Sequence, residues 1–268
     1  MDTKEIVHRS SRAFWRKWSI AVKITPLIIL IAMLRFLSHR FGYEILELNA
    51  LFTSLVAGTI FLIGFLISGV LSDYKESEKM PNELSASLKS MFDDTYTIYN
   101  SKNSDTALQF GEYQKAFLDS LLDWFYKKER TKSMMDKLSG MNDFFAEFDK
   151  EGIQPAYIIR MKNEQSNLRK MILRIDTIRD TDFIGTAYAI VEAMGAAISI
   201  GLIIIKIEPF YASLFFTLLV TSLIFYMIML IKDLDNPFDY SNVGESGTEI
   251  PLKPLRDLNI VLKETKLN

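Results

Sequence analysis

Four blocks of apolar residues stand out from the polar remainder of the chain. They cover residues 20–36, 49–71, 184–207 and 210–231. A helix needs about 20 apolar residues, with a range of roughly 17–25, to cross the hydrocarbon core of a bilayer. Only residues 208–209 separate the last two blocks, and a single crossing of their combined length would be far too long. The pattern therefore predicts four transmembrane helices, arranged as two hairpins.

Charged residues are rare inside these blocks. Lys23 and Arg35 lie near the two ends of the first block, where long basic side chains reach out to the membrane surfaces. Pro26 falls in the first turns of the expected helix, where proline is tolerated best. Glu192 is the one acid inside a predicted span. Such acids usually face a cavity or a partner, so Glu192 either marks a functional site, lies near the interface or pairs with a neighbouring helix.

The segment between the two hairpins is charged and has helical periodicity. Its apolar residues recur every three or four positions in four stripes: Leu84, Leu88 and Met91 or Phe92; Phe117, Leu121 and Phe125; Leu138, Met141, Phe145 and Phe148; and Leu168, Ile172, Ile175 and Ile178. Helix breaks are expected near residues 100–104, at Gly140 and near residues 152–155. With no alternating strand pattern, this segment is predicted to be an all-helical bundle that can continue the second and third membrane helices.

Basic residues indicate the orientation of the chain. They are concentrated in the amphipathic N-terminal arm, residues 1–19, and in residues 72–183, and cytoplasmic segments of membrane proteins are enriched in Lys and Arg. We therefore predict an all-α, multi-pass protein of the cell membrane with both termini cytoplasmic. A cytoplasmic helical bundle is inserted between the second and third of its four transmembrane helices. The hairpins span residues 20–71 and 184–231, and the C-terminal segment, residues 232–268, packs on the bundle.

Composition excludes several classes of function. Hydrophobic residues make up 49% of the chain and the net charge is -2, so neither a soluble protein nor a nucleic-acid partner is indicated. The chain has no cysteine and only His8 and His39, which argues against thiolate and histidine metal sites. No nucleophile elbow, phosphate loop or metalloprotease motif is present. We expect no enzyme activity, no metal and no cofactor.

Two groups of acids are better explained as solvated surface than as binding sites. Asp93 and Asp94 are expected to be solvated helix surface, which is the usual place of aspartate. Acids of the C-terminal segment could bind calcium through their oxygens, but their spacing lacks the density of a calcium-binding loop, so solvated turns are the better interpretation. These acids are Asp233, Asp235, Asp239, Glu245 and Glu249.

The second apolar block has a face of a distinct character. Ala57, Phe61, Phe65 and Ser68 follow one another at helical spacing, with Gly58, Gly64 and Gly69 beside them. Small residues of this kind allow ordinary close packing between membrane helices. The same pattern also fits a hydrophobic constriction in a pore, which can close to ions by losing its water. Periodicity alone favours the packing interpretation, and both remain open at this point.

Three stretches resemble the bestrophin family, especially its prokaryotic members. Residues 14–28, FWRKWSIAVKITPLI, are similar to the start of that family's first span. Residues 61–84, FLIGFLISGVLSDYKESEKMPNEL, resemble its pore helix, with Tyr74 and Glu78 in comparable places. Residues 231–255, IKDLDNPFDYSNVGESGTEIPLKPL, resemble the segment that follows its last span, where Pro237 and Phe238 match best. The combination and order of these stretches carry the resemblance, because no single motif is specific.

The resemblance implies an oligomeric channel, pentameric in that family, that conducts inorganic anions such as chloride across the lipid bilayer. By position, the second helix would line the pore and Phe61 and Phe65 would form its narrow neck. The sequence also departs from the family. Leu71, Ser72 and Asp73 replace an Arg-Trp-Trp signature, and the dense acidic run of the eukaryotic calcium clasp is absent, so calcium gating is not expected.

Other classes of function compete with the channel. A non-conducting membrane-anchored scaffold or sensor would bind a protein partner through its helical bundle, near residues 127–141. A membrane enzyme lacks visible catalytic groups. A transporter would be expected to show inverted repeats or broken helices, which the sequence does not have. Oligomeric state and a partner on the bundle discriminate between the channel and the scaffold.

Overall fold

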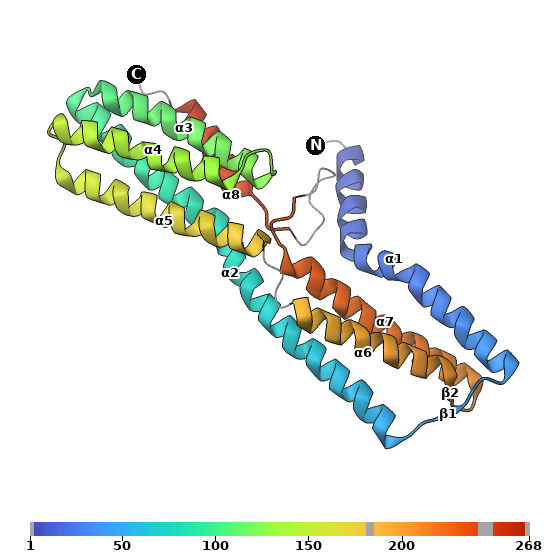
Figure 1. Ribbon diagram of the computed structural model, residues 1–268. Helices are drawn as coiled ribbons and strands as arrows, with labels where there is room; N and C mark the ends of the chain where they lie inside the picture. Colours follow the sequence, from blue (N-terminus) through green and yellow to red (C-terminus); the bar gives the residue numbers. More distant parts are fainter. Residues whose placement is uncertain (1–2, 181–184, 241–248, 266–268) are drawn as a thin grey trace. The chain divides into compact units, whose positions relative to one another are not determined.

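The computed structural model describes residues 3–180, 185–240 and 249–265, with side chains from Trp18 onward (Figure 1). Ile184, at the predicted start of the third block, and Glu245 lie outside the described residues. The described chain is almost entirely helical. Its elements are α1 (Thr3–Phe41), β1 (Leu46–Glu47), α2 (Ala50–Lys102), α3 (Asp105–Phe125), α4 (Thr131–Lys150), α5 (Pro155–Asp180), α6 (Gly185–Ile204), β2 (Ile205–Lys206), α7 (Phe210–Asp235) and α8 (Lys253–Glu264).

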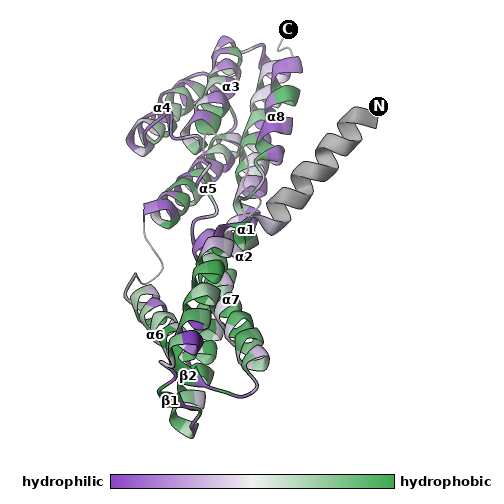
Figure 2. Ribbon diagram, turned by 90° about the vertical axis from the view of Figure 1, so that its right-hand side faces the viewer, coloured by the Kyte–Doolittle hydropathy of each residue, from purple (hydrophilic) through white to green (hydrophobic). Residues whose placement is uncertain are grey.

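The chain divides into two compact units. The first, here called the span unit, comprises Met1–Asp73 and Asp182–Asp235, and the second, the bundle unit, comprises Tyr74–Thr181 and Asn236–Asn268. Four helical stretches are long and apolar enough to cross a membrane by length and composition. Figure 2 shows apolar residues along α6, α7 and the first part of α2, and a mixture of polar and apolar residues on α3, α4, α5 and α8. The chain is an all-α membrane protein, as its hydropathy predicts.

Helices of the span unit pack through aliphatic side chains and small residues. α1 packs against α6 and α7, and α6 against α7. The core takes residues from three helices: Ile63, Leu66 and Val70 from α2, Val191, Ile198 and Leu202 from α6, and Ile224, Ile228 and Ile231 from α7. A Cβ atom at Gly195 would lie 3.0 Å from Ile224 Cγ2, so α6 and α7 approach closely there, as small residues allow.

The first helix is longer than its apolar block. α1 begins at Thr3, and Pro26 therefore lies well inside it rather than in its first turns. The prediction for Pro26 was wrong because the polar residues that precede the apolar block continue the same helix.

The bundle unit buries the stripes that its sequence predicts. Residues of all four stripes, from Leu84 to Ile178, have exposed fractions of 9% or less. Phe110 of α3 contacts the rings of three phenylalanines of α4, at centroid distances of 5.0 to 5.8 Å. The 3.6-residue period alone specifies these buried faces.

The expected break at Gly140 does not occur, because α4 runs without interruption from Thr131 to Lys150. A Cβ atom at Gly140 would lie 2.7 Å from the hydroxyl of Tyr113, and that hydroxyl donates a hydrogen bond to the carbonyl oxygen of Lys137. Gly140 thus provides room for the tyrosine of α3 and does not end the helix.

C-terminal residues that the structure describes contribute to the bundle core. Phe238 is fully buried and its ring lies 5.9 Å from that of Phe125. The hydroxyl of Tyr240 donates to the carbonyl oxygen of Ile250. α8 packs against α3 through its apolar face, and its Lys263 pairs with Asp119 at 2.7 Å. This helix begins at Lys253 with Pro254 in its first turn, where proline is compatible with a helix.

Candidate pore-lining helix

The residues singled out on the second apolar block share one exposed face of α2. Phe61 is 73% exposed and Phe65 is 69% exposed, and Ala57 and Ser68 are also exposed. Ile63 and Leu66, on the opposite side, are buried in the span unit. A helix turns once every 3.6 residues, so residues three or four apart lie on one side. Two large aromatic rings therefore project from α2 away from the core of its own chain.

This exposed face differs from the exposed face of α7. On α7 every exposed residue from Tyr211 to Leu223 is large and apolar or aromatic, as suits a surface that faces lipid, where polar side chains are costly. On α2 the exposed residues include Ser54, Gly64 and Ser68 among the phenylalanines. A Cβ atom at Gly64 would meet no atom within 4 Å, so packing inside the chain does not require a glycine there.

Several contacts fix the start of α2. The side chain of Asn49 accepts a hydrogen bond from the backbone N–H of Phe52 at 2.8 Å and so caps the helix. β1 pairs in parallel with β2, with Leu46 opposite Ile205. The ring of Phe52 lies against Gly201 of α6, closer than any Cβ atom at that position would permit. The start of α2 is therefore held by its own cap and by residues 201–206 of the span unit.

Arg35 is buried, whereas the sequence predicts that it reaches the membrane surface. Its side chain is 0% exposed. Nη1 donates to the carbonyl oxygen of Ile203 at 2.9 Å, Nη2 donates to Ser213 Oγ at 2.6 Å, and Nη2 lies 2.9 Å from Glu44 Oε1. The prediction was wrong because all three partners come from segments that the local pattern does not connect to Arg35.

Glu192 has a partner on the neighbouring helix. Its carboxylate pairs with the ammonium of Lys232 on α7, and both side chains are about half exposed. Lys23 of α1 lies 3.9 Å from Asp233, also on α7. Of the three interpretations of Glu192 that the sequence left open, the structure shows the pairing with a neighbouring helix.

The residues that carry the family resemblance after the apolar block have packing roles in the bundle unit. Tyr74 packs against the bundle core. Burial, and then the negative charge of Glu78, raise the pKa of the Tyr74 phenol. The carbonyl oxygen of Pro237 accepts from the backbone N–H of Ile250 at 3.1 Å. Asp239, one of the C-terminal acids that could have bound calcium, instead pairs with Lys127 at 2.6 Å.

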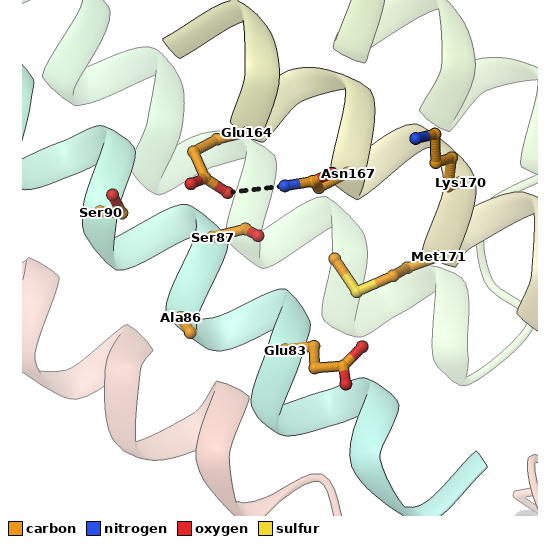
Figure 3. A pocket seen from close by; sticks show the side chains of 8 residues that line it. All are labelled: Glu83, Ala86, Ser87, Ser90, Glu164, Asn167, Lys170 and Met171. Atoms are coloured by element: carbon orange, nitrogen blue, oxygen red, sulfur yellow. Dashed lines mark hydrogen bonds between the residues drawn. The ribbon is translucent and has the colours of Figure 1, made fainter. Parts of the chain in front are cut away.

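A groove runs between α2 and α5 of the bundle unit, with a volume of about 570 Å³ (Figure 3). Ion pairs also connect these two helices: Arg174 contacts Glu76 through two nitrogens, at 3.3 and 3.0 Å, and Arg160 pairs with Asp94. The polar side chains that line the groove carry both signs of charge: Glu83, Ser87, Ser90, Glu164, Asn167 and Lys170. Figure 3 shows Asn167 bonded to Glu164 on the same helix. Mixed charge does not favour an ion of one sign here.

Asp94 differs from its predicted state as solvated surface. It is only 4% exposed. Burial raises the pKa of its carboxyl group, and the charge of Arg160 opposes that rise. Asp93 is exposed as expected and pairs with Lys89 on the same helix. Across the described residues, no group of three or more His, Cys, Asp or Glu side chains is arranged to hold a metal ion.

Comparisons with known proteins place this arrangement among solved folds. No family model and no curated protein sequence matches the chain. A bacterial bestrophin homologue from Klebsiella pneumoniae, solved as a point mutant, matches with a TM-score of 0.76 and 14% identity, over 92% of this chain and 99% of its own. A second mutant of such a homologue matches with a TM-score of 0.74 and 14% identity, over 91% of this chain and 97% of its own.

A further solved chain, described as a membrane protein mutant, matches at 15% identity with a TM-score of 0.73, covering 90% of this chain and 97% of that one. At such identities the likeness concerns the fold, and it extends over nearly the whole length of each chain. The bestrophin-like resemblance read from three short stretches of sequence is confirmed at that level. The chain has the fold of the bacterial bestrophin homologues.

Proposed function

We propose that the protein is an oligomeric ion channel, conducting anions such as chloride through a pore lined by α2. The observation that carries this proposal is the exposed face of α2, on which Ala57, Phe61, Phe65 and Ser68 stand together. Large rings at two successive turns, with small residues beside them, are suited to a narrow apolar constriction. Such a constriction controls conduction by losing or gaining its water.

One chain cannot enclose a path for ions with a single exposed helix face. Copies arranged around an axis would bring their Phe61 and Phe65 rings together and convert an exposed face into a lined channel. Closed cyclic symmetry is the common arrangement of identical subunits. The resemblance of the sequence to bestrophins favours five copies.

The chemistry of this face is compatible with the passage of anions. Residues 50–72 of α2 carry no charge, so no fixed carboxylate there would repel an anion. The edges of aromatic rings bear partial positive charge, and rings whose edges face an axis would favour anions there. Chloride is the simplest ion that fits these conditions.

The proposed topology follows from the charge distribution and the four candidate spans. Both termini and the bundle would be cytoplasmic, with the bundle inserted between the second and third membrane helices. The hairpins would cover residues 20–71 and 184–231, residues 72–183 would form the cytoplasmic bundle, and residues 1–19 and 232–268 would be its cytoplasmic flanks. The pair of Glu192 with Lys232 would then lie toward the cytoplasmic end of the spans.

The test uses purified protein in liposomes, with separate assays for chloride and potassium flux. We expect chloride flux from the wild type, and altered flux when Phe61→Ala and Phe65→Ala are combined. The matched control combines Phe215→Ala and Phe216→Ala, which removes two exposed rings from α7. Mass measurement of the intact complex gives the number of copies. A strictly monomeric protein without flux would overturn the proposal and leave a membrane-anchored scaffold as the better account.

A further inference from the structure

Arg35 of α1 joins three separate segments of the span unit. Its guanidinium donates to Ile203 at the end of α6 and to Ser213 in the first turn of α7, and it pairs with Glu44 in the loop before β1. Arginine can make such a three-way junction because its planar group holds five donors in fixed directions. A lysine would offer the charge without this geometry.

Burial makes the carboxylate of Glu44 essential to this junction. The Arg35 side chain is fully buried, and Glu44 is only 16% exposed. A buried cation is strongly unfavourable unless an anion and hydrogen-bond acceptors surround it. Within the described residues, Glu44 is the one acid within ion-pair distance of Arg35. The same carboxylate oxygen lies 3.1 Å from Nδ1 of His39, whose ring stacks on Phe210 at 4.1 Å.

Glu44 stands directly before the structure that starts α2. Two residues after it, β1 begins its pairing with β2, and five residues after it Asn49 caps the helix. The Phe52 ring then rests against Gly201. A carboxylate held in place by Arg35 therefore fixes the chain at the point from which α2 departs. Phe61 follows three helical turns later, about 16 Å along the axis at 1.5 Å per residue.

We infer that Arg35 and Glu44 are positioning residues for the pore-lining helix. They set the placement of the first turns of α2 and, through the rigid helix, the placement of Phe61 at the constriction. This inference rests on the proposed function, because only a conducting protein gives the position of Phe61 a functional consequence. His39, which is about half exposed, contacts the same carboxylate oxygen of Glu44 as Arg35 does.

The test combines flux through liposomes with hydrogen exchange of the backbone at residues 46–53, measured on the full chain in detergent. The variants are Arg35→Gln, Arg35→Lys, Glu44→Gln, Glu44→Asp and the double variant Arg35→Gln with Glu44→Gln. Lys23→Gln is the matched control, since Lys23 is also a cation of α1 but is half exposed and 3.9 Å from its acid.

We expect exchange at residues 46–53 to become at least about tenfold faster in either Gln variant, because a charge-assisted hydrogen bond is lost. Chloride flux or its preference over potassium should change with it. The exchange rates and fluxes of Arg35→Lys and Glu44→Asp should lie between those of the Gln variants and the wild type. These conservative variants keep the test informative where a Gln variant does not fold. In the double variant, exchange at residues 46–53 should be no faster than in the faster of the two single Gln variants, because both substitutions remove the same interaction.

Two outcomes separate this inference from the proposed function. A wild type that conducts, with variants whose exchange and flux equal those of Lys23→Gln, would overturn the positioning role and leave the channel intact. A wild type that conducts no ion would overturn the channel and with it the functional part of the inference, while the exchange data would still decide whether Arg35 and Glu44 hold the start of α2.

Discussion

The guanidinium of Arg35 lies 2.9 Å from the carboxylate of Glu44, and no part of the Arg35 side chain is exposed. The pair sits where α1 ends and the chain turns toward α2. Buried ion pairs of this kind contribute little net stability relative to apolar residues, but removal of one partner is costly because the other charge stays buried. The arrangement is therefore better suited to fixing geometry than to adding stability.

Removal of the Glu44 charge should destabilise the protein, because it leaves a buried cation unpaired. We expect Glu44→Gln to lower the free energy of unfolding by about 3–5 kcal/mol, since the Arg35 charge is left without a counter-ion. Asp233→Asn is the control, because its pair with Lys23 is partly exposed and such pairs contribute at most about 1 kcal/mol. Unfolding in detergent, followed by circular dichroism, measures both. Equal losses in the two variants would show that burial of Arg35 is not the cause.

Gly201 should tolerate no side chain. A methyl group there would overlap the Phe52 ring, and overpacking of this kind costs about 1–3 kcal/mol. We expect Gly201→Ala to destabilise the span unit and to raise hydrogen exchange in the first turn of α2. At Gly58 nothing lies within 4 Å of an added Cβ, so Gly58→Ala should leave exchange in that turn unchanged. Similar exchange in both variants would argue against close packing of Phe52 on α6.

Replacement of Gln114 by an apolar residue should stabilise the protein. It is fully buried in α3, and neither atom of its side-chain amide has a hydrogen-bond partner among the described residues. A buried amide without partners costs about 1–3 kcal/mol. We expect Gln114→Met to raise the free energy of unfolding by an amount in that range. Denaturant unfolding of the full chain measures it, and a destabilised variant would mean that the amide is satisfied in solution, for example by bound water.

Glu129 should make the bundle unit sensitive to acid. Burial alone would raise the pKa of its carboxyl group, but hydrogen bonds from Lys137 and Ser133 outweigh burial and leave the pKa below its ordinary value of 4.5. A lowered pKa in the folded state means that the ionised group stabilises the protein above pH 4.5, and that this contribution is lost as the pH falls through the lowered pKa.

The expected result for Glu129→Gln is therefore a loss of stability at pH 7 that diminishes as the pH falls below 4.5. The difference in stability is measured by thermal unfolding of the wild type and the variant between about pH 3 and about pH 7, a range that covers the usual titration of carboxyl groups. A difference that stays constant across that range would contradict the assigned cause. Glu147→Gln, whose carboxylate is exposed and pairs within one helix, is the control.

Helix faces could be predicted from the sequence, and contacts between distant segments could not. Leu84, Phe117 and Leu168 are all at most 2% exposed, because a period of 3.6 residues is a local property that directly names the buried side. Arg35 lies 168 residues from one acceptor and 178 from another. No local pattern connects such residues, so its apparent place near the end of an apolar block suggested the membrane surface instead.

Glycine and proline were misleading for a related reason. Gly140 suggested a break because glycine weakens helices by about 1 kcal/mol relative to alanine, but its role is to admit Tyr113 from a neighbouring helix. Pro26 was placed in the first turns of its helix, because the polar residues before residue 20 gave no apolar period from which to extend the helix. In both cases tertiary packing or helix continuation outweighed local propensity.

The candidate site was partly predictable in the same sense. That Ala57, Phe61, Phe65 and Ser68 share a face follows from their spacing. The exposure of that face is a finding of the structure, in which Ile63 and Leu66 are buried on the other side. Lining of a pore by this face remains a prediction, because its surroundings are set by neighbouring copies. The proposed anchoring of α2 by Arg35 had no signal in the sequence other than a cation near the end of an apolar block.

Modification of a single cysteine at position 61 shows whether this face of α2 borders a water-filled pore. The chain has no cysteine of its own, so Phe61→Cys and, as control, Phe215→Cys on the exposed face of α7 each carry one thiol. If α2 lines the pore, a charged, water-soluble thiol reagent should reduce chloride flux through Phe61→Cys in liposomes and leave Phe215→Cys unchanged. If the thiol at position 61 is no more reactive than that at 215, or if its modification leaves the flux unaltered, the face of α2 borders lipid and the account is contradicted.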